Sequence, residues 1–257
     1  MAETIEQADG SITSQQKLWL ERVGMIELLR RDPKSLIGKL DFAKRKGVAV
    51  VCIDERVQSQ KGTLKDMAFL RLAGSGILLG SDLEDSIKRA VKLLRGRVHM
   101  ITWHRGCGAA AEAKRRFGLE GNVDDIAREF AEELARRLGV LCRELLLTGP
   151  LGFHNARGVI VDGTGHYRAS RYMPEMFVVS RELIGDATIA RDNLLMARDI
   201  ATGHHGFAEL FEAQKQPFQV VVLGKDQKQR DKLLHEVYDT KIHSDSVEVH
   251  SVVVPLT

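Results

Sequence analysis

The chain has 257 residues, of which 44% are hydrophobic and 28% charged, a composition typical of a folded protein with a substantial core. This composition argues against a disordered or fibrous chain. The formal net charge of +3 at pH 7 is too small to indicate a nucleic-acid partner by itself, so none is expected.

The chain has three cysteines, Cys52, Cys107 and Cys142, an odd number that is unlike the disulfide frameworks of small secreted proteins. Metal binding or simple burial explains them better. Residues 1–16 are acidic and polar, whereas a signal peptide begins with basic residues and an apolar stretch. No apolar run is long enough to span a bilayer. We therefore expect a cytoplasmic protein that does not associate with membranes.

Residues 1–46 are predicted to form a helical arm. Apolar residues recur at helical spacing between residues 18 and 29, which predicts an amphipathic helix that ends near Asp32, and a second short helix is expected to follow. Basic residues gather in this second part of the arm, and a solvated helix face explains them better than an anionic partner does. They are Lys34, Lys39, Lys44, Arg45 and Lys46.

An alternation of strands and helices begins at residue 47. The first strand is an unbroken, β-branched apolar run, typical of a strand that is buried on both faces. The first helix follows a turn of small residues and begins with Ser81 and Glu84 at capping-box spacing. The predicted elements are strands at 48–53, 68–72, 98–103 and 145–147, and helices from 81 to about 96 and from about 123 to 138.

A β-hairpin is predicted next, with arms at residues 159–161 and 166–168 joined by a turn at 162–165. Pro174 marks a predicted boundary between a core at residues 47–173 and a C-terminal α/β extension at 174–257. The extension is either a separate unit or a continuation of the core sheet, and no repeated sequence segment is evident. Its predicted elements are strand 176–179, helix 187–200, strand 218–223, helix 227–238 and strand 247–254.

Strands that alternate with helices predict an α/β protein with a central, mostly parallel sheet flanked by helices. Five chemically informative side chains fall at the carboxyl ends of two of its inner strands, the edge where open α/β sheets build their sites. They are Cys52, Asp54, Arg56, His104 and Cys107.

Two thiolates and one imidazole make a three-ligand zinc set that leaves a fourth position open for water or substrate, which is the pattern of a catalytic zinc. Taken singly, a cysteine at a strand end is more often a small buried residue, and a histidine there is more often a satisfied polar group. The convergence of Cys52, His104 and Cys107 on one edge favours metal binding.

Three segments resemble the successive motifs of the β-class carbonic anhydrases, which read C-x-D-x-R, R-N-A-G-N and H-x-x-C-G. In this chain they are residues 52–56, 71–75 and 104–108, in the same order and at similar spacing. The resemblance covers about residues 47–110 and does not extend to the C-terminal region. It implies a β-carbonic anhydrase-like fold and a homodimer or higher homo-oligomer.

The resemblance also implies roles for the site residues. Cys52, His104 and Cys107 would bind Zn²⁺, and a metal-bound hydroxide would hydrate carbon dioxide reversibly to bicarbonate, which is a lyase reaction. Asp54 would accept a hydrogen bond from that hydroxide, and Arg56 would hold Asp54 in place and keep it ionised.

The chain departs from the family motifs at four positions. Leu72 and Ser75 replace two asparagines, and Trp103 and Arg105 flank His104 where smaller residues are usual. Two alternatives therefore stay open. One is a related substrate, carbon disulfide or carbonyl sulfide, at the same site, and the other is a non-catalytic zinc-stabilised binding protein.

Overall fold

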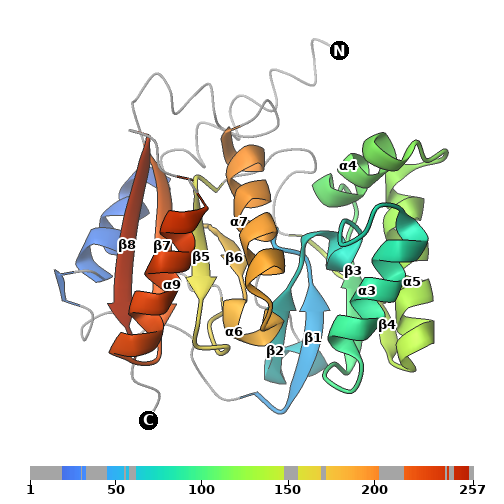
Figure 1. Ribbon diagram of the computed structural model, residues 1–257, viewed down its shortest axis with the longest axis horizontal. Helices are drawn as coiled ribbons and strands as arrows, with labels where there is room; N and C mark the ends of the chain where they lie inside the picture. The colour runs from blue at the N-terminus through green and yellow to red at the C-terminus, as the bar shows by residue number, and fades with distance from the viewer. Residues whose placement is uncertain are drawn as a thin grey trace.

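The structure is a computed structural model that describes residues 19–29, 31–32, 45–54, 56–57, 62–147, 156–168, 172–202, 217–240, 242 and 246–254. Its described residues form two four-stranded sheets in which every pairing is parallel, with helices packed on them (Figure 1). The predicted α/β class with parallel strands is confirmed, but the strands belong to two sheets instead of one central sheet.

The first sheet has the strand order β2-β1-β3-β4. The prediction of β1, β2 and β3 is confirmed to within two residues at each end. The predicted strand at 145–147 is wrong in position, because the fourth strand ends at Glu144. Its residues alternate between exposed and half-buried positions and so form no apolar run. The strands are β1 (Gly47–Val51), β2 (Met67–Arg71), β3 (Met100–Trp103) and β4 (Leu141–Glu144).

Three α-helices connect the strands of the first sheet: α3 (Leu83–Leu94), α4 (Gly108–Phe117) and α5 (Val123–Leu138). The N-cap of α3 is Asp82, whose side chain accepts from the Asp85 amide, one residue after the predicted Ser81 cap. Helix α4 was not predicted from the sequence. It begins directly after Cys107, so the third candidate ligand lies at a helix N-terminus.

The second sheet has the order β6-β5-β7-β8, and the predicted hairpin is wrong. Strand β5 lies between two parallel partners, so both of its edges are occupied and residues 166–168 cannot pair with it. Because β5 and β6 pair with each other, the predicted boundary at Pro174 lies within this sheet. Its elements are β5 (Gly158–Asp162), β6 (Phe177–Val179), α6 (Arg181–Ile184), α7 (Ala187–Thr202), β7 (Phe218–Gly224), α9 (Gln227–Asp239) and β8 (Val247–Val253).

The two sheets have the same strand order. In the second sheet β6, β5, β7 and β8 occupy the places that β2, β1, β3 and β4 occupy in the first. The sheets meet edge to edge at β2 and β6, and Figure 1 shows their strands pointing in opposite directions. The Ser180 hydroxyl bridges this contact, because it donates to the Phe69 carbonyl at 2.7 Å and accepts from the Arg71 amide at 3.3 Å. A repeat that the sequence does not reveal is therefore present in the fold.

The predicted N-terminal helix is present over residues 19–29 and packs against the second sheet of the same chain. Trp19, Ile26 and Leu29 are buried in one apolar cluster with Ile160 of β5 and Val221 of β7. The second predicted helix of the arm, and the rest of residues 1–18 and 33–44, lie outside the described residues. Among the helices that are described, none combines the length and the hydropathy needed to cross a membrane.

Candidate metal centre

The three candidate ligands converge at the carboxyl edge of the first sheet. Cys52 directly follows β1, His104 directly follows β3, and Cys107 caps α4. One ligand atom from each lies within 4.8 Å of the other two, and the residues are 6%, 1% and 2% exposed. In the described parts of the chain no other three His, Cys, Asp or Glu side chains form such a group. This group could hold a metal ion.

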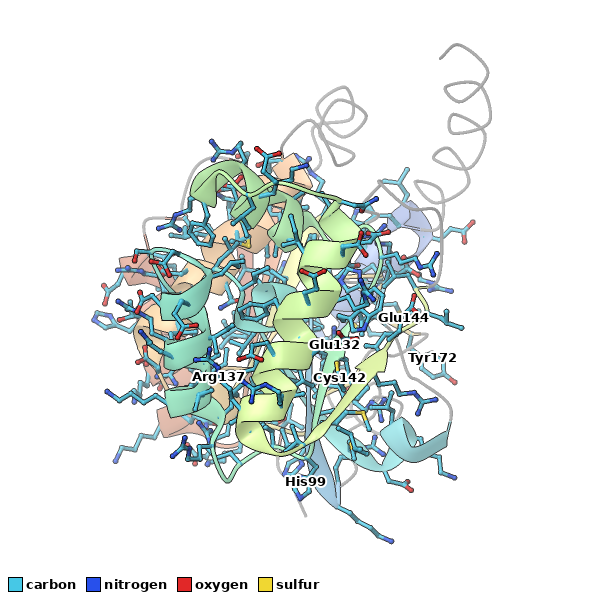
Figure 2. All side chains as sticks on the ribbon, turned by 90° about the vertical axis from the view of Figure 1, so that its right-hand side faces the viewer. His99, Glu132, Arg137, Cys142, Glu144 and Tyr172 are labelled. Atoms are coloured by element: carbon cyan, nitrogen blue, oxygen red, sulfur yellow. The ribbon has the colours of Figure 1, made fainter. Side chains whose placement is uncertain are left out.

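The third cysteine, Cys142, lies elsewhere. It is half-buried on β4 beside Glu132 of α5 (Figure 2). Burial raises the pKa of its thiol to about 11, and the Glu132 carboxylate adds to that effect. Cys142 thus lies outside the ligand group and provides an internal control for the two site thiols.

The imidazole of His104 is oriented for metal binding. Its Nδ1 lies 2.9 Å from the Arg105 carbonyl and donates to it, which leaves Nε2 as the nitrogen available to a metal. Nε2 is buried and has no hydrogen-bond partner among the described residues. A buried nitrogen without a partner is costly. Coordination through Nε2, with Nδ1 bonded to a backbone carbonyl, is the usual arrangement of a metal-binding histidine, so the residues fit a metal.

The two thiols interact with each other, and this contact shifts their pKa values in opposite directions. The contact with Cys107 raises the pKa of Cys52, and burial raises it further. The same contact lowers the pKa of Cys107, and the amides of Ala110 and Ala109 at the start of α4 also favour its thiolate. Burial opposes a charge on His104, yet the Cys52 sulfur and Asp54 together raise its pKa to about 9. Cys107 is therefore the thiol that ionises more readily, and its thiolate would attract a cation.

A short turn after β2 supports the first thiol. This turn, η2 (Ala73–Gly76), places the Gly74 amide 3.3 Å from the Cys52 sulfur. Gly74 has φ +50°, and a Cβ there would lie 2.7 Å from Ile77 Cγ2, so only glycine fits. Ser75 also has positive φ, 58°, a conformation that asparagine adopts more readily, and its hydroxyl donates to the Thr102 carbonyl at 2.5 Å.

Asp54 and Arg56 form the buried ion pair that the motif predicts. The carboxylate Oδ2 accepts from Arg56 Nη2 at 2.6 Å, and Oδ1 accepts from Arg56 Nε at 2.9 Å. Oδ2 lies 3.9 Å from His104 Nε2, so the carboxylate lies beside the ligand group without belonging to it. The site thus combines three soft or borderline ligands with one oriented hydrogen-bond acceptor.

Arg71 is a supporting residue to which sequence analysis assigned no role. Its Nη1 donates to the carbonyls of Cys52 and Asp54, both at 3.2 Å, and its Nη2 donates to the Val57 carbonyl at 2.8 Å. Burial lowers the pKa of this arginine to about 10. Two signals were available in the sequence. Arg71 is the first residue of the second motif, and it ends a predicted strand, where a buried arginine needs several acceptors.

The charge of Arg105 affects the site less than the sequence indicated. Arg105 is directed to the surface, where its Nε lies 3.0 Å from Glu144 and its side chain is 64% exposed. Its charge therefore does not enter the ligand group. The Gly106 amide donates to Asp124 Oδ1 at 2.8 Å, which ties the loop between His104 and Cys107 to the first turn of α5.

Comparisons of the chain with protein-family models, with curated proteins and with solved structures find no match. Its function is therefore argued from the chemistry and geometry of this site.

Proposed function

We propose that the protein is a zinc enzyme that reversibly hydrates carbon dioxide to bicarbonate, as its resemblance to the β-class carbonic anhydrases implies. The main support is the position of Asp54, whose Oδ2 is held by Arg56 and lies 3.9 Å from the free nitrogen of His104. A purely structural metal site has no need of an oriented carboxylate beside its ligands. Water and carbon dioxide would give bicarbonate and one proton.

In this proposal Cys52, His104 and Cys107 hold the zinc, and two thiolates with one imidazole suit that metal. When bound, zinc lowers the pKa of a coordinated water and so supplies a strong nucleophile at neutral pH. All other contributions come from side chains of the protein. Burial of the three ligands excludes bulk water from them and strengthens electrostatic interactions at the site.

Asp54 would orient the nucleophile. An ionised carboxylate only accepts hydrogen bonds, so it would bind the proton of the attacking oxygen and direct a lone pair toward the substrate carbon. Arg56 would keep Asp54 ionised and fix its rotation through two contacts. Arg71 would hold the loop that carries Cys52 and Asp54, because it donates to both of their carbonyls.

The test is metal content together with stopped-flow hydration of carbon dioxide, measured on the purified protein and on two variants. We expect about one zinc per chain and rapid hydration in the parent. Asp54→Asn keeps the shape of the side chain and should keep its zinc while losing about 100-fold in rate. Cys142→Ser is the matched control for Cys52→Ser: only the second should lose the metal.

Other outcomes would overturn parts of the proposal. A protein without zinc would remove its basis, and equal rates in the parent and Asp54→Asn would exclude the assigned role of Asp54. Zinc with hydrolysis of carbon disulfide or carbonyl sulfide, but no hydration of carbon dioxide, would show a different substrate at the same site. Zinc with none of these activities would indicate the non-catalytic binding protein.

A further inference from the structure

The second half of the chain repeats the strand order of the first but not its ligands. The residue after β1 is Cys52 and the residue after β3 is His104, whereas Gly163 follows β5 and Lys225 follows β7. At the equivalent helix start, α9 has Asp226 as its N-cap, and the Asp226 side chain accepts from the Gln229 amide. The described residues of this half contain no metal-binding group.

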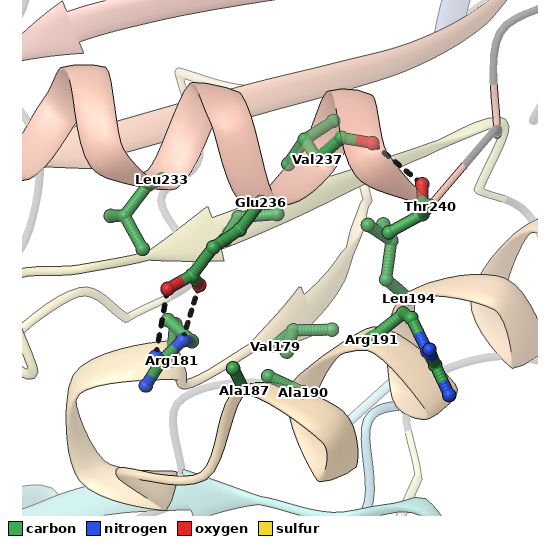
Figure 3. A pocket seen from close by; sticks show the side chains of 11 residues that line it. Val179, Arg181, Ala187, Ala190, Arg191, Leu194, Leu233, Glu236, Val237 and Thr240 are labelled. Carbon is green, nitrogen blue, oxygen red and sulfur yellow. Dashed lines mark hydrogen bonds and ion pairs between the residues drawn. The ribbon is translucent and has the colours of Figure 1, made fainter.

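The polar groups of the second sheet edge are already used within the fold. The Asp162 carboxylate accepts from the Thr164 amide at 2.8 Å and from the Thr164 hydroxyl at 2.6 Å. Beside the ends of β5 and β6, Arg181 and Glu236 form a two-point ion pair over a small pocket (Figure 3). The second half therefore contributes something other than a second metal centre.

Its contribution to the first site is an apolar wall. A small cavity is lined by Cys52 and Asp54, and also by Phe177 of β6 and by Met196 and Ile200 of α7. The cavity has a volume of about 10 Å³, close to the minimum that one water molecule needs. An apolar wall facing a carboxylate favours small uncharged molecules over anions.

A second, larger cavity shares Met196 with the first. It has a volume of about 140 Å³ and is lined by residues between 72 and 79 around η2, by Arg89 of α3 and by residues between 188 and 196 of α7. Ile189 and Leu79 line this outer cavity alone, whereas Met196 lines both cavities. Met196 is thus the one lining residue that the outer cavity shares with the smaller, inner cavity beside Cys52.

The position of Met196 is fixed relative to the metal-binding residues. Asn193 precedes it by three residues on α7, and its Oδ1 accepts from the Ala73 amide at 2.7 Å while its Nδ2 donates to the Ile189 carbonyl at 2.7 Å. Ala73 is the first residue of the turn whose Gly74 amide contacts the Cys52 sulfur. A methionine side chain is flexible, so on this fixed helix it can open or close a narrow passage.

We propose that Met196 is the barrier between the outer and inner cavities, and that it restricts the access of large and anionic molecules to the Cys52–His104–Cys107 group more than that of small uncharged ones. The C-terminal half thus supplies the selective wall of a site whose ligands all come from the N-terminal half. The nature of the substrate rests on the proposed function, but access to the two thiols does not, and it can be measured separately.

The first test measures thiol access in the full-length chain, stripped of metal and carrying Cys142→Ser so that only Cys52 and Cys107 react. Methyl methanethiosulfonate is the small probe, and dithiobis(nitrobenzoate) is the large anionic one. Met196→Ala should speed the large probe about tenfold, and Met196→Trp should slow both probes by a similar factor, because close-packed walls respond to side-chain volume. Met196→Leu and Ile189→Ala should stay within about twofold of the parent rate.

Circular dichroism, and comparison with the labelling rate in guanidinium, identify any variant that is unfolded. Met196→Trp tests the proposal in the opposite direction to Met196→Ala, because it should slow labelling. Rates that are equal in the parent, Met196→Ala and Met196→Trp would overturn the barrier. The second test uses the zinc-loaded protein, in which Met196→Ala should raise kcat/KM for carbon disulfide relative to carbon dioxide by about fivefold or more. If thiol access depends on Met196 but the protein has no hydratase activity, the barrier stands and the proposed function is rejected. If the protein hydrates carbon dioxide but thiol access is the same in all Met196 variants, the proposed function stands and the barrier is rejected.

Discussion

The guanidinium of Arg56 meets the carboxylate of Asp54 at two points, Nε to Oδ1 at 2.9 Å and Nη2 to Oδ2 at 2.6 Å, and neither side chain is more than 2% exposed. A buried ion pair is weak evidence for added stability, because desolvation of the two charges offsets their attraction. Two-point contact does fix the rotation of the carboxylate. The pair is therefore best explained as a device that holds Oδ2 beside His104 Nε2.

Removal of one partner of this pair should be costly. Arg56→Ala leaves the buried Asp54 carboxylate without its guanidinium, and we expect the free energy of unfolding to fall by about 3 kcal/mol. Urea denaturation measures this. Arg105→Ala is the control, because its pair with Glu144 is exposed and should contribute less than about 1 kcal/mol. Equal losses in the two variants would contradict the account of the buried pair.

Arg71 should affect metal binding without touching the metal. Arg71→Met removes the donors to the Cys52, Asp54 and Val57 carbonyls, and we expect about 2 kcal/mol lower stability and about tenfold weaker metal binding. Chelator competition gives the affinity. Arg89→Met, which removes an exposed ion pair on α3, should change neither quantity appreciably. Unchanged metal affinity in Arg71→Met would show that the loop keeps its shape without this arginine.

Gly74 offers a test of the turn beneath the Cys52 sulfur. Gly74→Ala introduces both a positive φ for alanine and a contact with Ile77 Cγ2 at 2.7 Å, whereas Gly118→Ala introduces only the positive φ. The control should lose about 1 kcal/mol of stability. Gly74→Ala should lose clearly more and should also bind metal less tightly. Identical behaviour of the two variants would mean that close packing at Gly74 has no influence on the site.

Metal binding should weaken as the pH falls. In the metal-free protein burial opposes charge on His104, but the Cys52 sulfur and Asp54 raise its pKa to about 9, so below that pH a proton must leave before the metal binds. Affinity should fall about tenfold per pH unit for each proton displaced. Competition titrations between pH 6 and 9 measure the slope, which should be shallower in His104→Ala. A flat profile would exclude imidazole coordination.

The same raised pKa predicts how the metal-free fold depends on pH. A pKa of about 9 in the folded state lies above the usual histidine value of 6.5. The stabilisation of the fold by protonated His104 is therefore fully present below about pH 6.5. This contribution is lost as the pH rises through about 9. Urea denaturation of the parent and of His104→Ala across this range should show a difference that shrinks with rising pH, and a constant difference would refute the linkage.

Elements with a strong local pattern could be predicted from the sequence. The apolar run at β1, the helical spacing of α5 and the strands β6 and β7 all lie close to their expected positions. The false hairpin after β5 shows the limit of local patterns. Its turn residues are real turn formers, but Gly158 pairs with Gln219, far along the chain, and such parallel pairing has no signal in a short segment.

The sequence by itself determined the candidate metal-binding group, because Cys52, His104 and Cys107 follow strands that their own residues specify, and parallel strands end at one edge. Only the tertiary structure decided what surrounds that group. The Ala73 amide donates a hydrogen bond to Asn193, which lies 120 residues further along the chain. Met196 lines the cavity beside Cys52 only because β2 and β6 bring the two sheets edge to edge. Contacts of this kind depend on how two complete units pack, and that information is spread over the whole chain.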